Sequence, residues 1–167
     1  GLNKSMCIYG TNIYIGDLYA IRHMDTTTLQ VTTLAGSVNV SGDTDANGTA
    51  SRLNYPTGMA CDANYVYFND YSNNKIKKML RTPPYTVSTI VGDGTFSTSD
   101  GVGAAAKIAS PDGMVIVGNT LYVTSYFGLL RTVDLSTLKV TSLTYPPTDG
   151  LTANVDGYVS GTFVGPD

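Results

Sequence analysis

The residues best suited to bind a metal ion form one loop, Asp43-Thr44-Asp45-Ala46-Asn47-Gly48. Oxygen-bearing side chains at alternate positions, followed by a glycine, are what a calcium-binding loop requires, so Asp43, Asp45 and Asn47 predict a calcium site. The twelfth position of such a loop carries a bidentate glutamate, and here it is Asn54. The alternative is an ordinary turn, in which aspartate accepts backbone N–H groups and glycine takes a positive φ. No other cofactor is predicted.

His23 is the only histidine, and this limits the catalytic and metal chemistry open to the chain. A zinc site needs cysteine or carboxylate partners at recognisable spacing, and the sequence around His23 offers none. No Ser-His-Asp or Cys-His arrangement is indicated by position either. We therefore predict a structural role for His23 and no enzymatic activity.

Three tripeptides match the acceptor pattern for N-glycosylation, beginning at Asn3, Asn39 and Asn47. The second and third lie in one long loop, where an attached sugar could be accommodated. Chance matches are also expected in a chain so rich in Asn, Ser and Thr. The three asparagines are therefore glycosylation candidates in an extracellular protein.

Charged side chains are scarce, at 14% of the 167 residues, and the formal net charge is −3. Nucleic-acid binding draws much of its affinity from a basic face, so this balance argues against a nucleic-acid partner. The one basic cluster, Lys75, Lys77, Lys78 and Arg81, is interpreted as a solvated edge strand, because lysine at a sheet edge discourages strand addition. No apolar run is long enough to predict a membrane span.

The elements that must position these residues recur three times along the chain. Strand cores at residues 12–17, 65–70 and 120–125 are each followed by a basic-apolar strand containing Arg22, Lys77 or Arg131 and then by an outer strand at 31–34, 87–90 or 140–143. Four short strands in a period of about 55 residues describe one β-propeller blade. We therefore predict one all-β domain over residues 1–167, with three four-stranded antiparallel blades in repeats 5–57, 58–112 and 113–167. The loops equivalent to the calcium-type loop keep only an Asp-Gly element, at Asp100 and Asp156.

The second repeat contains a set of motifs that occur together: Pro56-Thr57-Gly58-Met59-Ala60-Cys61-Asp62, the Tyr67-to-Asp70 strand and Ser72-Asn73-Asn74-Lys75-Ile76. With the flanking Thr-Leu-Ala-Gly, they resemble an NHL repeat, closest to the long-loop NHL arrays of secreted bacterial proteins. The first repeat lacks the Pro-Gly turn and the Asn-Asn pair, and the third has Ser125 in place of the strand-ending Asp. The resemblance implies an NHL-type propeller with an extracellular or cell-surface location. Lyases similar to this family use several metal-binding histidines, which this chain does not have.

Cys7 and Cys61 fall one position apart on equivalent strands of the first two repeats. Neighbouring positions on a strand point to opposite faces, and adjacent blades present opposite faces to each other. The two sulfurs therefore point into the same gap between blades, or both point away from it. One interpretation is an interblade disulfide, provided that the Cα atoms are close enough. The other, which the pattern favours, is two buried thiols that act as small apolar groups.

Three blades do not close a propeller ring, which has about four to eight. An apolar face is left bare at each end, and such faces indicate an interface. Two copies would complete a six-bladed ring, a head-to-tail contact that does not close would build an open array or filament, and further blades of a longer polypeptide would also cover the ends. We predict a non-enzymatic scaffold that associates blade to blade with other copies or further blades in an extracellular or surface assembly. The alternative is a binding module that recognises a glycan or peptide through loops on one propeller face.

Overall fold

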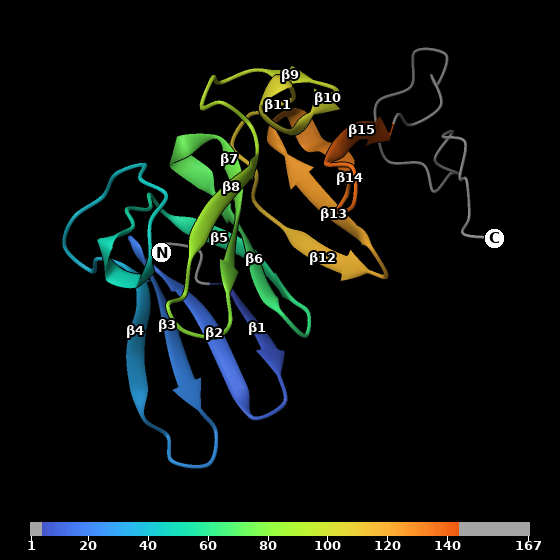
Figure 1. The fold of residues 1–167 in the computed structure, drawn as a ribbon. Coiled ribbons are helices and arrows are strands. Elements are labelled where there is room, and N and C mark those ends of the chain that lie inside the picture. Colours follow the sequence, from blue (N-terminus) through green and yellow to red (C-terminus); the bar gives the residue numbers. More distant parts are fainter. Residues whose placement is uncertain (1–4, 144–167) are drawn as a thin grey trace.

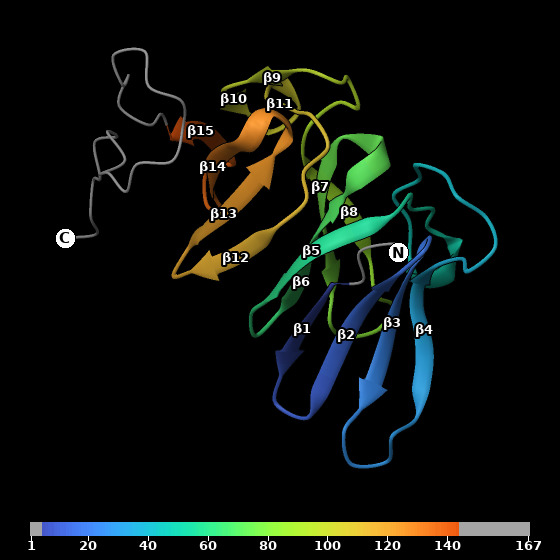
Figure 2. The same cartoon turned by 180° about the vertical axis from the view of Figure 1, so that it is seen from behind.

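The computed structural model describes residues 5–143, and the fold in that range is all-β. Three main antiparallel sheets follow one another along the chain and fan out side by side (Figure 1, and from behind in Figure 2). The helical residues of this range lie in short 3-10 turns: η1 (Gly48–Ala50), η2 (Tyr71–Asn73), η3 (Gly103–Ala105) and η4 (Tyr126–Gly128). No helix within residues 5–143 is long and apolar enough to cross a membrane. The predicted all-β class, with four-stranded antiparallel sheets like those of propeller blades, is confirmed.

Each main sheet is an up-and-down meander whose strands are hydrogen-bonded in chain order. Sheet 1 contains β1 (Met6–Tyr9), β2 (Asn12–Asp17), β3 (Ala20–Asp25) and β4 (Val31–Gly36). Sheet 2 contains β5 (Pro56–Cys61), β6 (Tyr65–Asp70), β7 (Lys75–Leu80) and β8 (Val87–Val91). Sheet 3 contains β12 (Met114–Val117), β13 (Thr120–Ser125), β14 (Leu129–Asp134) and β15 (Lys139–Leu143). This is the strand plan of successive propeller blades.

Sheet 3 has a fifth strand that the four-stranded pattern does not predict. β10 (Gly101–Val102) pairs antiparallel with β15, through Gly101↔Val140 and Val102↔Lys139. It belongs to the second connection, residues 92–113, which also forms a two-stranded pair from β9 (Thr98–Ser99) and β11 (Lys107–Ile108). The outermost strand of a sheet has backbone N–H and C=O groups without a partner strand. The second connection is long enough for its strand β10 to pair with those groups on β15. The repeat boundaries themselves stay a prediction, since residues 144–167 lie outside the described range.

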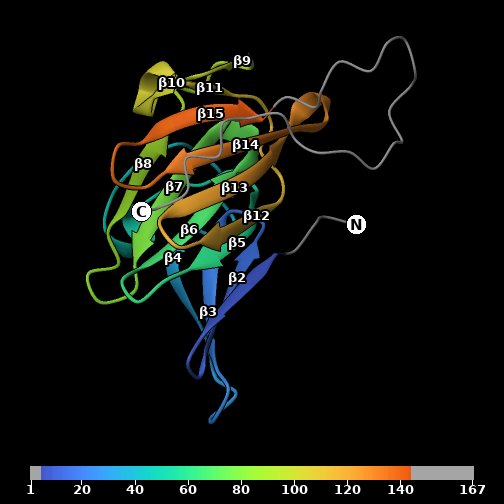
Figure 3. The same ribbon diagram turned by 90° about the vertical axis from the view of Figure 1, so that its right-hand side faces the viewer.

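The burial of each sheet follows from its place in the stack, which Figure 3 shows with sheet 3 in front of sheet 2 and sheet 1 behind. β6 is buried on both faces, because Val66 and Phe68 pack toward sheet 1 while Tyr67 packs toward sheet 3. A strand covered on both sides reads as a nearly continuous apolar run. β1 and β12, which belong to the end sheets, instead keep exposed residues along their lengths.

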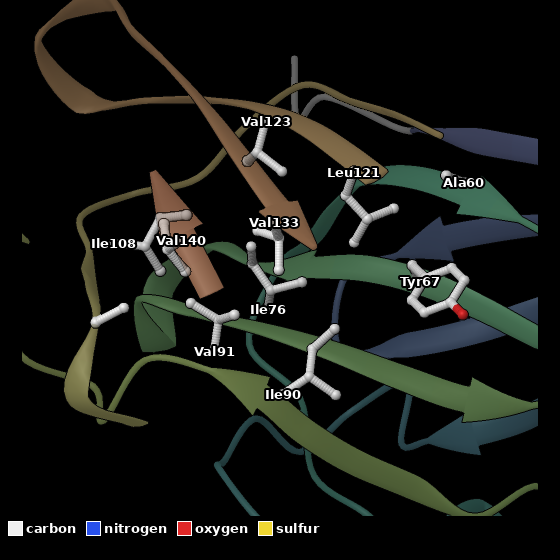
Figure 4. Packing of buried hydrophobic residues seen from close by; sticks show 11 residues of the cluster. Ala60, Tyr67, Ile76, Ile90, Val91, Ile108, Leu121, Val123, Val133 and Val140 are labelled. Atoms are coloured by element: carbon white, nitrogen blue, oxygen red, sulfur yellow. The ribbon is translucent and has the colours of Figure 1, made fainter. Parts of the chain in front are cut away.

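The apolar core lies in two layers, one in each gap between neighbouring sheets. The layer between sheets 1 and 2 includes Tyr14, Ile21, Phe68 and Met79. The layer between sheets 2 and 3 is shown in Figure 4, where side chains from β6, β7 and β8 meet those from β13, β14 and β15: Tyr67, Ile76, Ile90, Val91, Leu121, Val123, Val133 and Val140. The apolar faces of each sheet are therefore covered only by the neighbouring sheets, as the repeat pattern requires.

The basic strand β7 is not the solvated edge strand that the sequence suggested. It pairs on one side with β6 and on the other with β8, and the side chain of Lys77 is fully buried. The interpretation was wrong for Lys77 because it considered the strand alone. The carboxylates that pair with this lysine come from a connection more than 30 residues earlier in the chain.

Candidate functional site

A hollow of about 310 Å³ opens between sheets 2 and 3, at the ends of β6 and β13. Its walls come from η2, the second connection, the end of β13 and η4: Tyr71, Ser110, Asp112, Thr124, Ser125, Tyr126 and Gly128. This volume falls at the lower end of the range of small-molecule sites. None of these residues was singled out as a ligand contact from the sequence.

The hollow exists because sheet 3 has small residues where sheet 2 has larger ones. At the end of β6, Asp70 accepts hydrogen bonds from the backbone N–H of Asn54 (2.6 Å) and from Nδ2 of Asn73 (2.7 Å). At the end of β13 the corresponding residues are Ser125 and Gly128. Ser125 is nearly buried, and its Oγ has no hydrogen-bond partner among the described residues. A buried hydroxyl without a partner beside an open space is suited to bonding a ligand or water there.

The lining combines aromatic rings with hydroxyl groups. Tyr71 and Tyr126 are 38% and 47% exposed, and the ring of Phe96 packs edge-on against Tyr126 at 5.1 Å between centroids. Ser110, Thr124 and Ser125 add hydroxyls, and the exposed Asp112 supplies the one carboxylate of the lining. Rings next to hydroxyls suit a ligand that has both an apolar face and hydroxyl groups of its own.

His23, the residue considered for catalysis and zinc binding, lies away from the hollow. His23 is on β3 in sheet 1, where its Nε2 is 2.7 Å from Oδ1 of Asn12. Within residues 5–143 no group of three or more His, Cys, Asp or Glu side chains is arranged to hold a metal ion. Among the described residues that line the hollow there is no histidine.

The calcium-type loop lies against sheet 2, and its carboxylates bind lysines. Lys77 Nζ donates to Asp43 (2.8 Å) and Asp45 (2.9 Å) and lies 3.5 Å from Asp70, while Lys75 Nζ donates to Asp43 (2.6 Å). The ammonium of Lys77 thus lies among three carboxylates and balances their negative charge, which is the role that a bound calcium ion would have. The calcium interpretation stays a prediction, but in this arrangement two of its proposed ligands are already used.

The ion pairs of this cluster move the pKa values of its members in opposite directions. Burial would raise the pKa of Asp43 and Asp45, but their hydrogen bonds, chiefly those from lysine, hold both below the ordinary value. Burial likewise disfavours the charged form of Lys77, but its bonds to Asp43 and Asp45 raise its pKa. Asp70 differs, because burial outweighs its hydrogen bonds and raises its pKa to about 6.

The raised pKa of Asp70 predicts a pH-dependent stability. The folded value lies above the value of about 3.9 for an unfolded aspartate, so this group's contribution is complete below pH about 4 and is lost as the pH rises through 6. A difference of this size corresponds to about 3 kcal/mol in the free energy of unfolding. The lowered pKa values of Asp43 and Asp45 act at more acidic pH, where protonation removes their stabilising effect.

Replacing Asp70 with asparagine is expected to flatten the pH dependence between pH 4 and 7, because the amide does not titrate. Its Oδ1 still accepts the N–H of Asn54, so the strand end keeps its bond. Urea unfolding of both proteins at several pH values in this window measures the difference. Parallel pH profiles for the wild type and Asp70→Asn would contradict the assignment.

The same type of contact joins the second connection to sheet 3. Asp45 bonds Lys77 and also accepts the backbone N–H and Oγ1 of Thr89 on β8 (2.7 and 3.1 Å). Asp100 accepts from Nη2 of Arg131 (2.8 Å) and from the N–H and Oγ of Ser142 on β15 (2.9 and 2.8 Å). We call this the loop-aspartate contact: an aspartate of one connection, a buried cation on the third strand of the next sheet and its cross-strand partner on the fourth. The sequence signal for it was the Asp-Gly element at Asp100 together with the three basic strands.

The candidate glycosylation sites lie in three settings. Asn39 is exposed in the first connection, residues 37–55. Asn47 is exposed too, and its Oδ1 accepts a hydrogen bond from Thr86 at 2.7 Å. Asn3 lies outside the described residues. Glycosylation at these positions stays a prediction.

Cys7 and Cys61 meet between sheets 1 and 2 and form a disulfide, with their Cα atoms 5.9 Å apart. This separation is ordinary for a disulfide. The bond joins β1 to β5, which lie against each other as the first strands of neighbouring sheets. The structure therefore brings the two sulfurs into one gap, and the buried-thiol interpretation favoured by the sequence pattern does not describe it. The pattern could not decide because strand parity leaves both directions open.

Comparison with known proteins gives neighbours in structure but none in sequence. No protein-family model and no curated protein sequence matches this chain. A solved protein of unknown function from Bacteroides thetaiotaomicron VPI-5482 is similar with a TM-score of 0.63 at 18% identity, covering 77% of this chain and 31% of that one. The fold is shared.

Two further neighbours carry functional descriptions. An auxiliary nutrient binding protein from Bacteroides ovatus ATCC 8483 is similar with a TM-score of 0.59 at 18% identity, covering 84% of this chain and 36% of that one. A suggested phosphatase from B. thetaiotaomicron VPI-5482 gives 0.57 at 20% identity, covering 82% and 33%. At these identities the likeness shows the fold alone. The chain spans about a third of the length of each neighbour.

Proposed function

We propose that this chain is part of a non-enzymatic, NHL-type propeller that binds a glycan or peptide at the hollow between sheets 2 and 3. The observation that carries the proposal is the buried, unpartnered Oγ of Ser125 next to two partly exposed tyrosines, Tyr71 and Tyr126. Hydroxyls outnumber charges in the lining, and this favours a glycan over a charged peptide. A neighbour described as an auxiliary nutrient binding protein supports a binding role for the fold.

The proposed setting is extracellular or at the cell surface. The Cys7–Cys61 disulfide supports it, since such bonds form and persist in oxidising compartments. The scarcity of charged side chains and the exposed sequons at Asn39 and Asn47 are compatible with that setting. Nothing in this proposal requires a cofactor.

The test is ligand binding by tyrosine variants. Screening on a glycan array selects a ligand, and isothermal titration then compares the wild type with Tyr71→Ala and Tyr126→Ala. Each substitution is expected to weaken binding about tenfold, because one stacked ring contributes on the order of 1–2 kcal/mol. Tyr9→Ala is the matched control, since Tyr9 is a comparably exposed ring on β1 in sheet 1. Equal affinities in all four proteins would exclude the hollow as the site.

A second candidate function is blade-to-blade association, as a six-sheet ring or a filament. It is favoured by the exposed apolar side chains of the two end sheets. Met6 and Ile8 on β1 are 61% and 62% exposed, and Val115 and Val117 on β12 are 54% and 62% exposed. Each pair lies on the face directed away from sheet 2, because the alternate residues Cys7 and Met114 contact sheet 2 or its core layer. Both ends of the stack therefore present apolar strand faces, as an interface does.

A further inference from the structure

Sheets 1 and 2 have equivalent faces, one of which is buried in sheet 2 and uncovered in sheet 1. Met59, Phe68 and Met79 of sheet 2 are at most 5% exposed, because sheet 1 packs on them. By the phase of the repeat their counterparts in sheet 1 are Met6, Ile15 and Met24, one exposed and two half-buried. Val87 is 1% exposed, and its counterpart Val31 is 48% exposed. The outer face of sheet 1 is thus built like a covered face, and nothing among the described residues covers it.

Arg22 occupies the position of Lys77 on this outer face. Arg22 pairs across the strands with Thr33, as Lys77 does with Thr89 and Arg131 does with Ser142. In sheets 1 and 2 a register shift falls at the same place, immediately before Arg22 and Lys77. The cation and the outer-strand hydroxyl of the loop-aspartate contact are therefore both present in sheet 1.

Within residues 5–143, no aspartate takes the corresponding place beside Arg22. Nε of Arg22 is buried and has no hydrogen-bond partner among the described residues. Arg131 also leaves Nε without a partner, but its other nitrogens bond Asp100 and the carbonyl of Lys107. Arg22 is half-buried, and a buried N–H without an acceptor is costly, so its Nε is suited to an acceptor that the described residues do not supply.

We infer that Arg22 and Thr33 form the acceptor site for Asp156 of a second copy of this chain. In both observed contacts, the aspartate is carried by the connection that follows one sheet and binds the next sheet. Residues 144–167 follow sheet 3 in the same way, and their Asp156-Gly157 repeats the Asp100-Gly101 element. Along the sequence, Asp45 precedes Pro56 by the same number of residues as Asp100 precedes Pro111. Asp156 precedes Pro166 by one residue fewer. This inference rests on the association function proposed above.

The outer face of sheet 3 fits the same partner. A sheet that precedes sheet 1 must offer an apolar face on its far side, and Val115 and Val117 provide one. Tyr122, the cross-strand partner of Val115, lies on the same face. Sheet 3 of one copy can thus cover the outer face of sheet 1 in the other, and the chain that continues after sheet 3 carries Asp156 in its sequence. Two such junctions related by a two-fold axis would close a ring of six sheets.

The test is a sedimentation velocity series on the full chain over a wide concentration range. Arg22→Gln and Asp156→Asn are each expected to weaken self-association about tenfold or more, since truncating one partner of a buried charge pair has at least that effect. Arg22→Asp and Asp156→Arg should each be impaired alone, whereas their equimolar mixture should associate, because one junction then pairs the two reversed charges and the other keeps the natural pair. Thermal unfolding at low concentration should leave Arg22→Gln unchanged and lower the Tm of Arg131→Gln, whose partner is within the chain.

The outcomes separate the inference from the function on which it rests. Association that is insensitive to Arg22→Gln, or a mixture that fails to associate, would overturn the Arg22–Asp156 contact and leave blade-to-blade association standing. A chain that stays monomeric at every concentration would overturn both. Ligand binding at the hollow is measured independently and is affected by neither result.

Discussion

Replacing Lys77 with methionine is expected to lower the free energy of unfolding by about 3 kcal/mol. The lysine is fully buried and holds Asp43, Asp45 and Asp70 together, and Asp70 is fully buried as well. Methionine keeps most of the volume but leaves these carboxylates without their cation. The loss lies at the lower end of the range for breaking a buried pair, because Asp70 can take up a proton when its pKa rises further.

The matched control for this prediction is Lys78→Met, one residue along the same strand. Lys78 points to the opposite face, where its Nζ lies 4.3 Å from the centre of the Tyr65 ring. It has no ion pair among the described residues, so its loss is expected to cost less than about 1 kcal/mol. Urea denaturation followed by circular dichroism measures both variants. A similar midpoint for the two would show that the Lys77 cluster adds nothing to stability.

Removing the Cys7–Cys61 disulfide as the double variant Cys7→Ala/Cys61→Ala is expected to lower the free energy of unfolding by about 4 kcal/mol. The bond spans 54 residues, and closing a loop of that length removes much conformational entropy from the unfolded chain. It also joins two sheets that are otherwise held by packing and a few polar contacts, such as the hydrogen bond from Nε of Arg81 to the Tyr14 hydroxyl (3.0 Å). Replacing both cysteines avoids leaving a free thiol that would complicate the comparison.

A reductant provides the control. Wild-type protein in dithiothreitol should unfold near the midpoint of the double variant, and the variant itself should not respond to the reagent. Alkylation without reductant, followed by mass measurement, should label neither cysteine in the wild type. Two labelled cysteines, or a wild-type midpoint that ignores the reductant, would show that the bond does not form.

The positions of the strands could be predicted from the sequence because they depend on the pattern of neighbouring residues. The expected cores at residues 12–17, 65–70 and 120–125 coincide with β2, β6 and β13. Alternating apolar and turn residues fix such strands wherever sheets stack on one another. β10 could not be predicted, since a two-residue strand is defined by the partner it finds, which here lies about 40 residues further along.

The site residues were predicted less well because they depend on contacts between distant parts of the chain. Asp43 and Asp45 match a metal-binding loop locally, and only the folded position of Lys77 reveals another partner. Ser125 was noted as a departure from the repeat, but the substitution alone does not show that a space results. Its counterpart Asp70 fills that space in sheet 2 together with Asn73, and Gly128 has no side chain with which to do so.

The direction of the loop-aspartate contact has a consequence for biosynthesis. Asp45 leaves the ribosome before Lys77, and Asp100 before Arg131, so each carboxylate is already in place when the strand that must bury a cation is completed. A nascent chain would therefore complete sheets 2 and 3 one at a time, and Lys77 and Arg131 would each meet their counter-charge without waiting for the rest of the polypeptide.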